Sequence, residues 1–208
     1  MFENVSRDLP SLMAAHGGVQ YVSINATEAD LISRDFVPRV FEALERHHIN
    51  PAWVTLEITE TMLMVGDNQN VKSVLDQLRS RGIRIALDDF GTGYSSLYNI
   101  RKFALDCLKI DRSFIDGMGK ERESAAIVHS IIHLGRALGL EVVAEGVETE
   151  AHLQALRLAG CSHYQGYYLA RPLEADVAID AAHERFMAPD EVEVVAAPVA
   201  VPGSGTHG

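Results

Sequence analysis

Cysteine and long apolar runs are both scarce in this sequence, and each shortage excludes a class of protein. The 208 residues include only two cysteines, Cys107 and Cys161, whose spacing fits neither a zinc site nor a redox pair, so we expect two buried, reduced thiols. No apolar stretch approaches the length that crosses a membrane. The N-terminal residues MFENVSRDLPSLM have no basic head and no continuous apolar segment, so we expect no secretory leader and a cytoplasmic location.

Positive charge is also in short supply. The chain has 18 Lys and Arg residues against 29 Asp and Glu residues, which gives a formal net charge of −11. This balance argues against binding a polymeric nucleic acid through a basic surface. It remains compatible with a small phosphate ligand, provided that metal ions supply the positive charge.

Short apolar runs alternate with longer amphipathic segments along most of the chain. The runs are rich in Val, Ile, Leu and Tyr and read as strands, while the segments between them have helical spacing. An unbroken alternation of strand and helix predicts a parallel α/β fold. The six predicted strands are residues 19–25, 53–59, 83–90, 106–111, 140–148 and 163–169.

The predicted helices fill the intervals between these strands. We expect a first helix over residues 2–16, which Pro10 breaks or restarts. Two later helices are expected to stop at Gly139 and Gly160, since glycine favours the left-handed conformation that ends a helix. The other helical segments are 36–49, 70–82, a short one from about Ser95, and 175–186.

Each of the six apolar runs ends in a polar residue that could take part in chemistry. In a parallel barrel the carboxyl ends of all strands surround one rim, which is where active sites lie. Carboxylate and amide oxygens suit hard divalent cations such as Mg²⁺ or Mn²⁺. The residues at the six ends are Asn25; Glu57; Asp88 and Asp89; Lys109 and Asp111; Glu145 and Glu148; and Gln165.

The adjacent aspartates in IALDDFGTGYSSL suggest a site for two cations. One cation could lie toward Asn25 and Glu57 and a second toward Asp89 and Glu145, with Asp88 between them. Two cations about 4 Å apart can activate a water and stabilise the leaving oxygen of a phosphodiester. The alternative is that the two aspartates only cap the loop and the helix that follow them.

Lys109 and the glycine-rich turn leave similar alternatives open. Lys109 could orient the attacking water or meet phosphate charge, or it could form an ion pair with a carboxylate such as Asp111. The GTG turn with Ser95 and Ser96 is a weak phosphate-loop signal, and the serines could instead cap a helix. His129 and His133 have metal-ligand spacing, but we expect a packing or surface role for them.

Five strings of residues resemble, in order, the motifs of the EAL-domain cyclic di-GMP phosphodiesterases. The resemblance spans residues 2 to about 186 and implies a TIM-like (β/α) barrel of the EAL type. It also implies hydrolysis of cyclic di-GMP to linear pGpG with two Mg²⁺ or Mn²⁺ ions per site. The strings are LEITE (56–60), ALDDFGTGYSSL (86–97), LKIDRSFI (108–115), VVAEGVET (142–149) and QGYYLARPL (165–173).

The resemblance assigns a metal-binding role to five of the polar residues. It implies that Asn25, Glu57 and Asp88 hold one ion. The second ion would be held by Asp88, Asp89 and Glu145. Asp89 and Glu145 are also expected to take part in catalysis.

The same resemblance gives roles to the remaining site residues. Lys109 would be a catalytic residue that holds the attacking water, and Asp111 would support the site. Glu60 would anchor the DDFGTG loop, which contributes to a homodimer in the family. Glu148 and Gln165 would line the site near metal and substrate.

One departure from the family pattern concerns the Glu-Ala-Leu motif itself. The family carries this motif on an early strand, where its glutamate completes the coordination of the first metal and a nearby arginine contacts the substrate. Here the letters EAL occur at residues 42–44, in a stretch with helical spacing that follows the Asn25 strand, so they cannot supply that ligand. We therefore expect an incomplete barrel with about six of eight strands.

The departure also shapes the expected domain organisation and function. Residues 1–186 would form an EAL-like domain without its first two strands, through truncation, a wrongly assigned start codon or degeneration. Residues 187–208 would be a mostly disordered tail, of which 192–201 could pair transiently with a sheet edge. The alternatives to an enzyme of this family are a catalytically inactive cyclic di-GMP-binding or protein-interaction module and an enolate-forming barrel enzyme, which the quoted strings disfavour.

Overall fold

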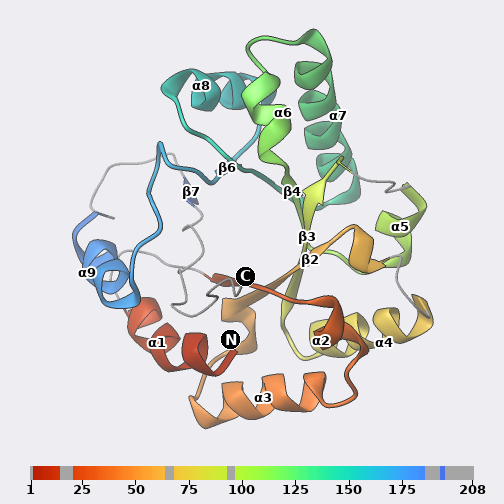
Figure 1. Cartoon of the computed structure of the whole chain (residues 1–208), viewed down its shortest axis with the longest axis vertical. Helices are drawn as coiled ribbons and strands as arrows, with labels where there is room; N and C mark the ends of the chain where they lie inside the picture. The colour runs from red at the N-terminus through yellow and green to blue at the C-terminus, as the bar shows by residue number, and fades with distance from the viewer. Residues whose placement is uncertain (1, 15–20, 64–67, 93–96, 186–192, 195–208) are drawn as a thin grey trace, which may run out of the picture.

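The strands pair in the order in which they occur along the chain. The computed structural model describes residues 2–14, 21–63, 68–92, 97–185 and 193–194. All strand pairs are parallel, and the helices lie around the outside of the resulting curved sheet (Figure 1). The strands are β1 (Val22–Asn25), β2 (Val54–Thr59), β3 (Arg84–Phe90), β4 (Cys107–Ile110), β5 (Glu141–Ala144), β6 (His163–Tyr164) and β7 (Glu193–Val194).

The first helix precedes β1, the later ones connect successive strands, and together they cover one face of the sheet. Helix α1 (Phe2–Ala14) packs against both α3 (Phe36–Arg46) and α9 (Ala175–Arg185) (Figure 1). The α-helices are α1 (Phe2–Ala14), α2 (Glu28–Ile32), α3 (Phe36–Arg46), α4 (Asn68–Ser80), α5 (Leu97–Lys102), α6 (Arg112–Gly117), α7 (Arg122–Leu138), α8 (Glu150–Ala159) and α9 (Ala175–Arg185). Two 3₁₀ turns, η1 (Pro51–Trp53) and η2 (Thr61–Leu63), flank β2.

The predicted parallel α/β fold and the incomplete TIM-like barrel are confirmed. All six predicted strands are present, and Gly139 and Gly160 end α7 and α8 in the left-handed conformation. Strand β7 adds a seventh member beside β6 within the predicted tail, whose other residues lie outside the described ranges. The predicted boundary at residue 186 stays a prediction.

Several details of the elements differ from expectation. Pro10 lies inside α1 and does not break it. Strand β6 ends at Tyr164, much earlier than expected. The chain turns after Gly166, whose carbonyl accepts from the N–H groups of Leu169 and Ala170 and whose Cα packs closely on the backbone of Val147. Helices α2 and α6 were missed, and each begins at a side-chain cap, from Thr27 and Asp111 respectively.

The two faces of the sheet have different chemistry. On the outer face, side chains such as Leu56 and Ile58 join the helices in one large apolar core. On the inner face, Ala86, Cys107 and Val143 form a small separate cluster, and a narrow cavity there is also lined by Thr55 and several other polar residues. The interior of this barrel is therefore partly polar, and this polar lining lies next to the charged groups at the rim.

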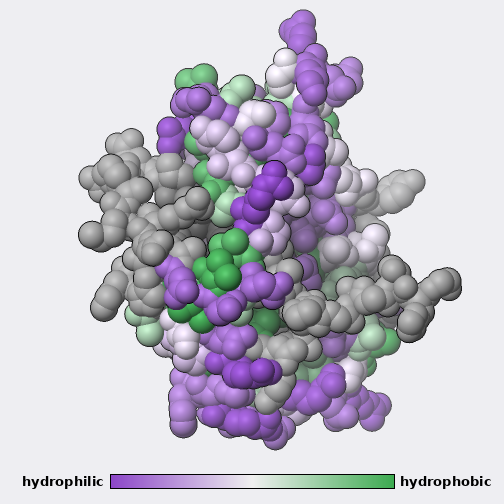
Figure 2. All heavy atoms as spheres, turned by 60° about the vertical axis from the view of Figure 1, so that its left-hand side comes forward, coloured by the Kyte–Doolittle hydropathy of each residue, from purple (hydrophilic) through white to green (hydrophobic). Residues whose placement is uncertain are grey.

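The surface agrees with the composition. On the side of the molecule where α9 lies, the described surface is mostly hydrophilic, with a hydrophobic area near its centre (Figure 2). Cys107 and Cys161 are both buried and free, as the sequence predicted. Among the described helices, none combines the length and the apolar content needed to cross a membrane.

Candidate active site

A buried lysine lies at the centre of the carboxyl-end rim. Lys109, on β4, is 4% exposed, and its Nζ lies 2.8 Å from Glu57 Oε1 on β2. The same Nζ lies 3.3 Å from Asp88 Oδ1 on β3 and 2.6 Å from Glu145 Oε1, just past β5. Four successive strands thus deliver one ammonium and three carboxylates to one point, and the ion pairs of Lys109 involve these acids and not Asp111.

Strand register explains why these side chains meet. Glu57 lies opposite Asn25 on β1 and Ala86 on β3, and Ala86 lies opposite Cys107 on β4. Residues two positions apart share a face of a strand, so Asp88 and Lys109 project from the same inner face as Glu57. Asn25, the ligand expected from β1, is the neighbour of Glu57 in the ladder and has an exposed side chain.

A bulge allows both adjacent aspartates to face the site. The register between β3 and β4 shifts between Leu87 and Phe90, and Asp89 has a positive φ of 54°. A non-glycine residue in this conformation is strained, and such strain is found at functional sites. As a result, one oxygen from each of Asp88, Asp89 and Glu145 lies within 4.8 Å of the others, an arrangement that could hold a metal ion.

The electrostatics of the cluster favour a cation. Burial, together with the charges of Asp88 and Glu57, raises the pKa of Glu145 to about 7 against the opposing effect of Lys109. Burial and the neighbouring Asp88 and Asp111 also raise the pKa of Asp89. Burial lowers the pKa of Lys109, but the surrounding carboxylates outweigh it, so the pKa rises and the amine stays charged. One ammonium does not balance this many carboxylates, and carboxylate oxygens suit hard divalent cations.

Glu60 holds the turn that follows the two aspartates. Its side chain is buried, and its Oε1 accepts a hydrogen bond of 2.9 Å from the backbone N–H of Gly91. Gly91 has a φ of 102°, and a Cβ atom there would lie 3.0 Å from the ring of Phe114. This contact supports the predicted anchoring of the loop, although residues 93–96, with Ser95 and Ser96, lie outside the described ranges.

The other predicted residues surround the cluster at various distances. Asp111 caps α6, with Oδ1 accepting from the N–H of Ser113 at 3.0 Å. Glu148 forms an ion pair of 2.9 Å with Arg112. Gln165 continues the β5–β6 ladder through its backbone, donating to the carbonyl of Ala144 at 2.8 Å. Their predicted functional roles stay predictions.

Two further sequence patterns lie outside the cluster around Lys109. The EAL letters at 42–44 fall on α3, where Glu42 is exposed and pairs with Arg46 at 2.8 Å. His129 and His133 are exposed on α7. None of these residues contributes to the cluster around Lys109.

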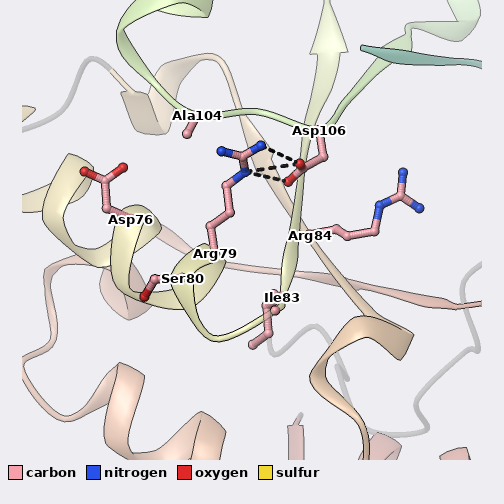
Figure 3. Close-up of a pocket in the computed structure, with 8 residues that line it drawn as sticks. Asp76, Arg79, Ser80, Ile83, Arg84, Ala104 and Asp106 are labelled. Carbon is pink, nitrogen blue, oxygen red and sulfur yellow. Dashed lines mark hydrogen bonds and ion pairs between the residues drawn. The ribbon is translucent and has the colours of Figure 1, made fainter. Parts of the chain in front are cut away.

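A larger pocket lies elsewhere, and its charged side chains are balanced by ion pairs. It has a volume of about 440 Å³ and lies at the amino end of β3. There the Arg79 guanidinium donates three hydrogen bonds of 3.0–3.3 Å to the Asp106 carboxylate (Figure 3). The second arginine that lines the pocket, Arg84, pairs with Glu141. Both arginines are thus neutralised by carboxylates, and the concentration of unbalanced charge remains at the rim.

Comparison with known proteins agrees with this geometry. The signaling protein YkoW of Bacillus subtilis is 42% identical over 153 residues, covering 73% of this chain and 19% of that protein. The bifunctional diguanylate cyclase/cyclic di-GMP phosphodiesterase MucR of Pseudomonas aeruginosa is 41% identical over 155 residues, covering 74% of this chain and 22% of that protein. The chain therefore spans about a fifth of the length of these relatives.

A solved structure matches the fold as well. The PaMucR phosphodiesterase in its c-di-GMP complex superposes with a TM-score of 0.78 at 38% sequence identity, covering 85% of this chain and 71% of that one. The EAL domain family matches residues 1–172. With the parallel barrel, the acidic rim and these matches in agreement, the chain belongs to the EAL domain family.

Proposed function

We propose that this chain hydrolyses a phosphodiester bond of cyclic di-GMP to give linear pGpG, with two Mg²⁺ or Mn²⁺ ions bound at the rim. The observation that carries the proposal is the contact of Lys109 with Glu57, Asp88 and Glu145 at the point where four strands end. It is supported by the phosphodiesterase activity in the name of MucR and by the c-di-GMP complex of PaMucR.

The donor set fits the implied metal ions. Asn25, Glu57 and Asp88 would hold one ion, and Asp88, Asp89 and Glu145 the other. The oxygen atoms of the last three approach one another closely enough to share a cation. When bound, such ions supply positive charge for the phosphate and lower the pKa of a coordinated water.

The protein residues contribute charge, orientation and a place for a proton. Lys109 Nζ is held as an ammonium between three carboxylates. In this proposal it would donate a hydrogen bond to the attacking water. Asp89 and Glu145 would each offer a carboxylate oxygen that no ion holds as the acceptor of the proton that the water loses. Glu60 keeps the chain after Asp89 in place through the N–H of Gly91.

A second function, binding cyclic di-GMP without turnover, has one observation in its favour. The EAL letters lie on α3, where Glu42 pairs with Arg46 on the helix surface. Within the described ranges the first ion would therefore rely on Asn25, Glu57 and Asp88 without a further acidic ligand. A weakly held ion would leave a site that binds the nucleotide and turns it over slowly or not at all.

One assay separates the two functions. Cyclic di-GMP is incubated with the chain and Mn²⁺ or Mg²⁺, products are separated by chromatography, and binding is measured by calorimetry on the same sample. Formation of pGpG that Glu145→Gln abolishes supports the enzyme, and saturable binding with no pGpG supports the module. If the sample shows neither pGpG formation nor binding of cyclic di-GMP, both functions are refuted.

The finer predictions about assembly and location belong to the same proposal. We propose a homodimer through the DDFGTG loop region, which Glu60 fixes at Gly91. Light scattering would give twice the chain mass of 22.8 kDa for a dimer, and a single chain mass at micromolar concentration would contradict it. The cytoplasmic location stays a prediction.

A further inference from the structure

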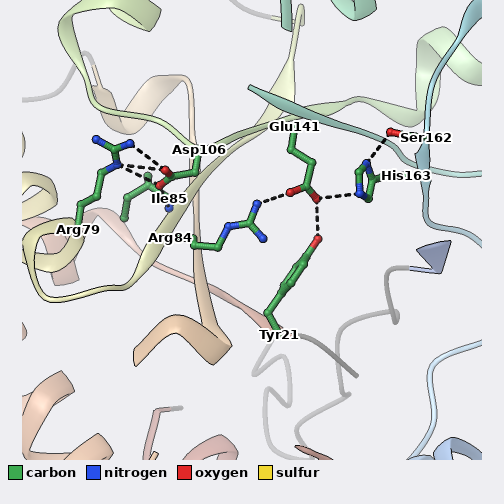
Figure 4. Close-up of polar contacts among 8 residues, drawn as sticks. All are labelled: Tyr21, Arg79, Arg84, Ile85, Asp106, Glu141, Ser162 and His163. Carbon is green, nitrogen blue, oxygen red and sulfur yellow. Dashed lines mark hydrogen bonds and ion pairs between the residues drawn. The ribbon is translucent and has the colours of Figure 1, made fainter. Parts of the chain in front are cut away.

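A second polar cluster occupies the opposite end of the barrel interior. Its centre is Glu141, the first residue of β5 (Figure 4). Tyr21, just before β1, donates a hydrogen bond of 2.9 Å from its hydroxyl to Glu141 Oε1. Arg84, at the start of β3, pairs with Glu141 Oε2, and His163 Nε2 on β6 lies 3.5 Å from Oε1. We call these four residues the basal cluster.

Three residues of the basal cluster lie on the same segments of the chain as proposed metal ligands. Tyr21, Arg84 and Glu141 each come four residues before a proposed metal ligand, as the numbers 21 and 25, 84 and 88, and 141 and 145 show. Residues four apart on a strand share a face and lie about 13 Å from each other. The three strands that carry Asn25, Asp88 and Glu145 are thus tied together at their other ends by one carboxylate.

The bond from Tyr21 is the most consequential of these ties. Among the described strands, β1 pairs only with β2, so it is the least restrained of the strands that carry proposed ligands. The hydroxyl of Tyr21 reaches across the interior to Glu141, 120 residues away in sequence and three strands beyond β2. The link therefore joins β1 to β5 without passing through the ladder between them.

The surroundings of Tyr21 make this hydrogen bond persistent. The Arg84 guanidinium lies over the face of the Tyr21 ring, 4.7 Å from the ring centre, and this cation–π contact holds the ring in place. The side chains of Arg84 and Glu141 are 29% and 16% exposed, which limits competition from water. Burial and the Glu141 carboxylate raise the pKa of Tyr21, so the phenol stays a donor at neutral pH. Hydrogen bonds to ionised acceptors are also stronger than those between neutral groups.

We propose that Tyr21 is a positioning residue for the rim: through Glu141 it fixes β1 relative to β5, and so the spacing between Asn25 and Glu145. This inference rests on the proposed metal-binding function. It assigns a task to a cluster that lies about 13 Å along the strands from the proposed metal ligands. It also makes the two outermost proposed ligands dependent on a contact at the far end of the barrel.

The test is the Mn²⁺ affinity of Tyr21→Phe, measured by calorimetry, with Tyr164→Phe as the matched control. Both variants remove one phenol hydroxyl, but Tyr164, which follows His163 on β6, packs in the outer core and donates to the carbonyl of Cys161 rather than to Glu141. We expect about fivefold weaker Mn²⁺ binding for Tyr21→Phe, the equivalent of about 1 kcal/mol for one lost hydrogen bond. Tyr164→Phe should bind within twofold of wild type, although each variant melts about 2–4 °C lower.

A second variant guards against an ambiguous result. Glu141→Gln keeps the size of the side chain but removes the negative charge that pairs with Arg84 and accepts the hydrogen bond of Tyr21. We therefore expect it to weaken Mn²⁺ binding more than Tyr21→Phe does. Adding Tyr21→Phe to it should then weaken binding by less than fivefold, because the two residues act through one contact. Equal affinities for wild type, Tyr21→Phe and Glu141→Gln would overturn the positioning role alone. Failure of the wild type to bind Mn²⁺ would instead overturn the metal-binding function and, with it, this inference.

Discussion

Replacing Lys109 with Met tests whether the rim is held together by charge. The substitution preserves much of the side-chain volume but removes the ammonium that contacts Glu57, Asp88 and Glu145 at 2.6–3.3 Å. Since Glu57 is 4% exposed, its carboxylate cannot recover its interaction with water. Removing one partner of a buried ion pair costs about 3–5 kcal/mol. For a domain of this size, that loss lowers the melting temperature by roughly 6–20 °C.

The assay is thermal unfolding by circular dichroism in EDTA, followed by titration with Mn²⁺. We expect Mn²⁺ to restore much of the lost stability in Lys109→Met, because a cation bound at a hundred times its Kd contributes about 2.7 kcal/mol. The matched control is Lys72→Met, which removes an exposed pair with Asp76 and should cost less than about 1 kcal/mol. The reasoning fails if Lys109→Met in EDTA is no less stable than Lys72→Met.

Three further predictions follow from individual contacts at the rim. The pKa of Glu145 is raised to about 7, so the folded state binds its proton more tightly than the unfolded state. The metal-free stability should therefore fall as the pH rises from about 4.5 to 7. Glu145→Gln should flatten this pH dependence in calorimetric scans. Asp111→Ala removes the cap of α6 and should cost about 0.5–2 kcal/mol in urea unfolding, whereas an unchanged midpoint would show that the cap is idle. Glu60→Ala leaves the N–H of Gly91 without its acceptor and should lower both stability, by about 1–3 kcal/mol, and pGpG formation; full activity would contradict its anchoring role.

The gathering of charged residues at the rim could be predicted because it depends on strand direction alone. Once the chain reads as repeated strand and helix, the ends of parallel strands must share one edge, so Glu57, Asp88, Lys109 and Glu145 were expected to meet. The ion pairs among them were predicted less well. Sequence proximity suggested Asp111 as a partner of Lys109, whereas the structure pairs Lys109 with acids from β2, β3 and the end of β5.

The features that sequence reasoning missed are local or depend on contacts distant in sequence. Helices α2 and α6 have 5 and 6 residues, too short for apolar periodicity to reveal, although the cap at Thr27 was a readable signal. The positive φ of Asp89 depends on the bulge between β3 and β4, which no propensity predicts. The basal cluster joins Tyr21 to Glu141 across 120 residues, and only its offset of four residues from the predicted ligands hinted at it.

The count of Mn²⁺ ions bound per chain tests the central claim most directly, because that claim places a pair of divalent cations among the carboxylates around Lys109. Equilibrium dialysis followed by elemental analysis should give two ions per wild-type chain and fewer than one for Asp88→Asn, since Asp88 is the proposed shared ligand. A wild-type chain that binds no Mn²⁺, or an Asp88→Asn variant that binds as much as wild type, would contradict the account.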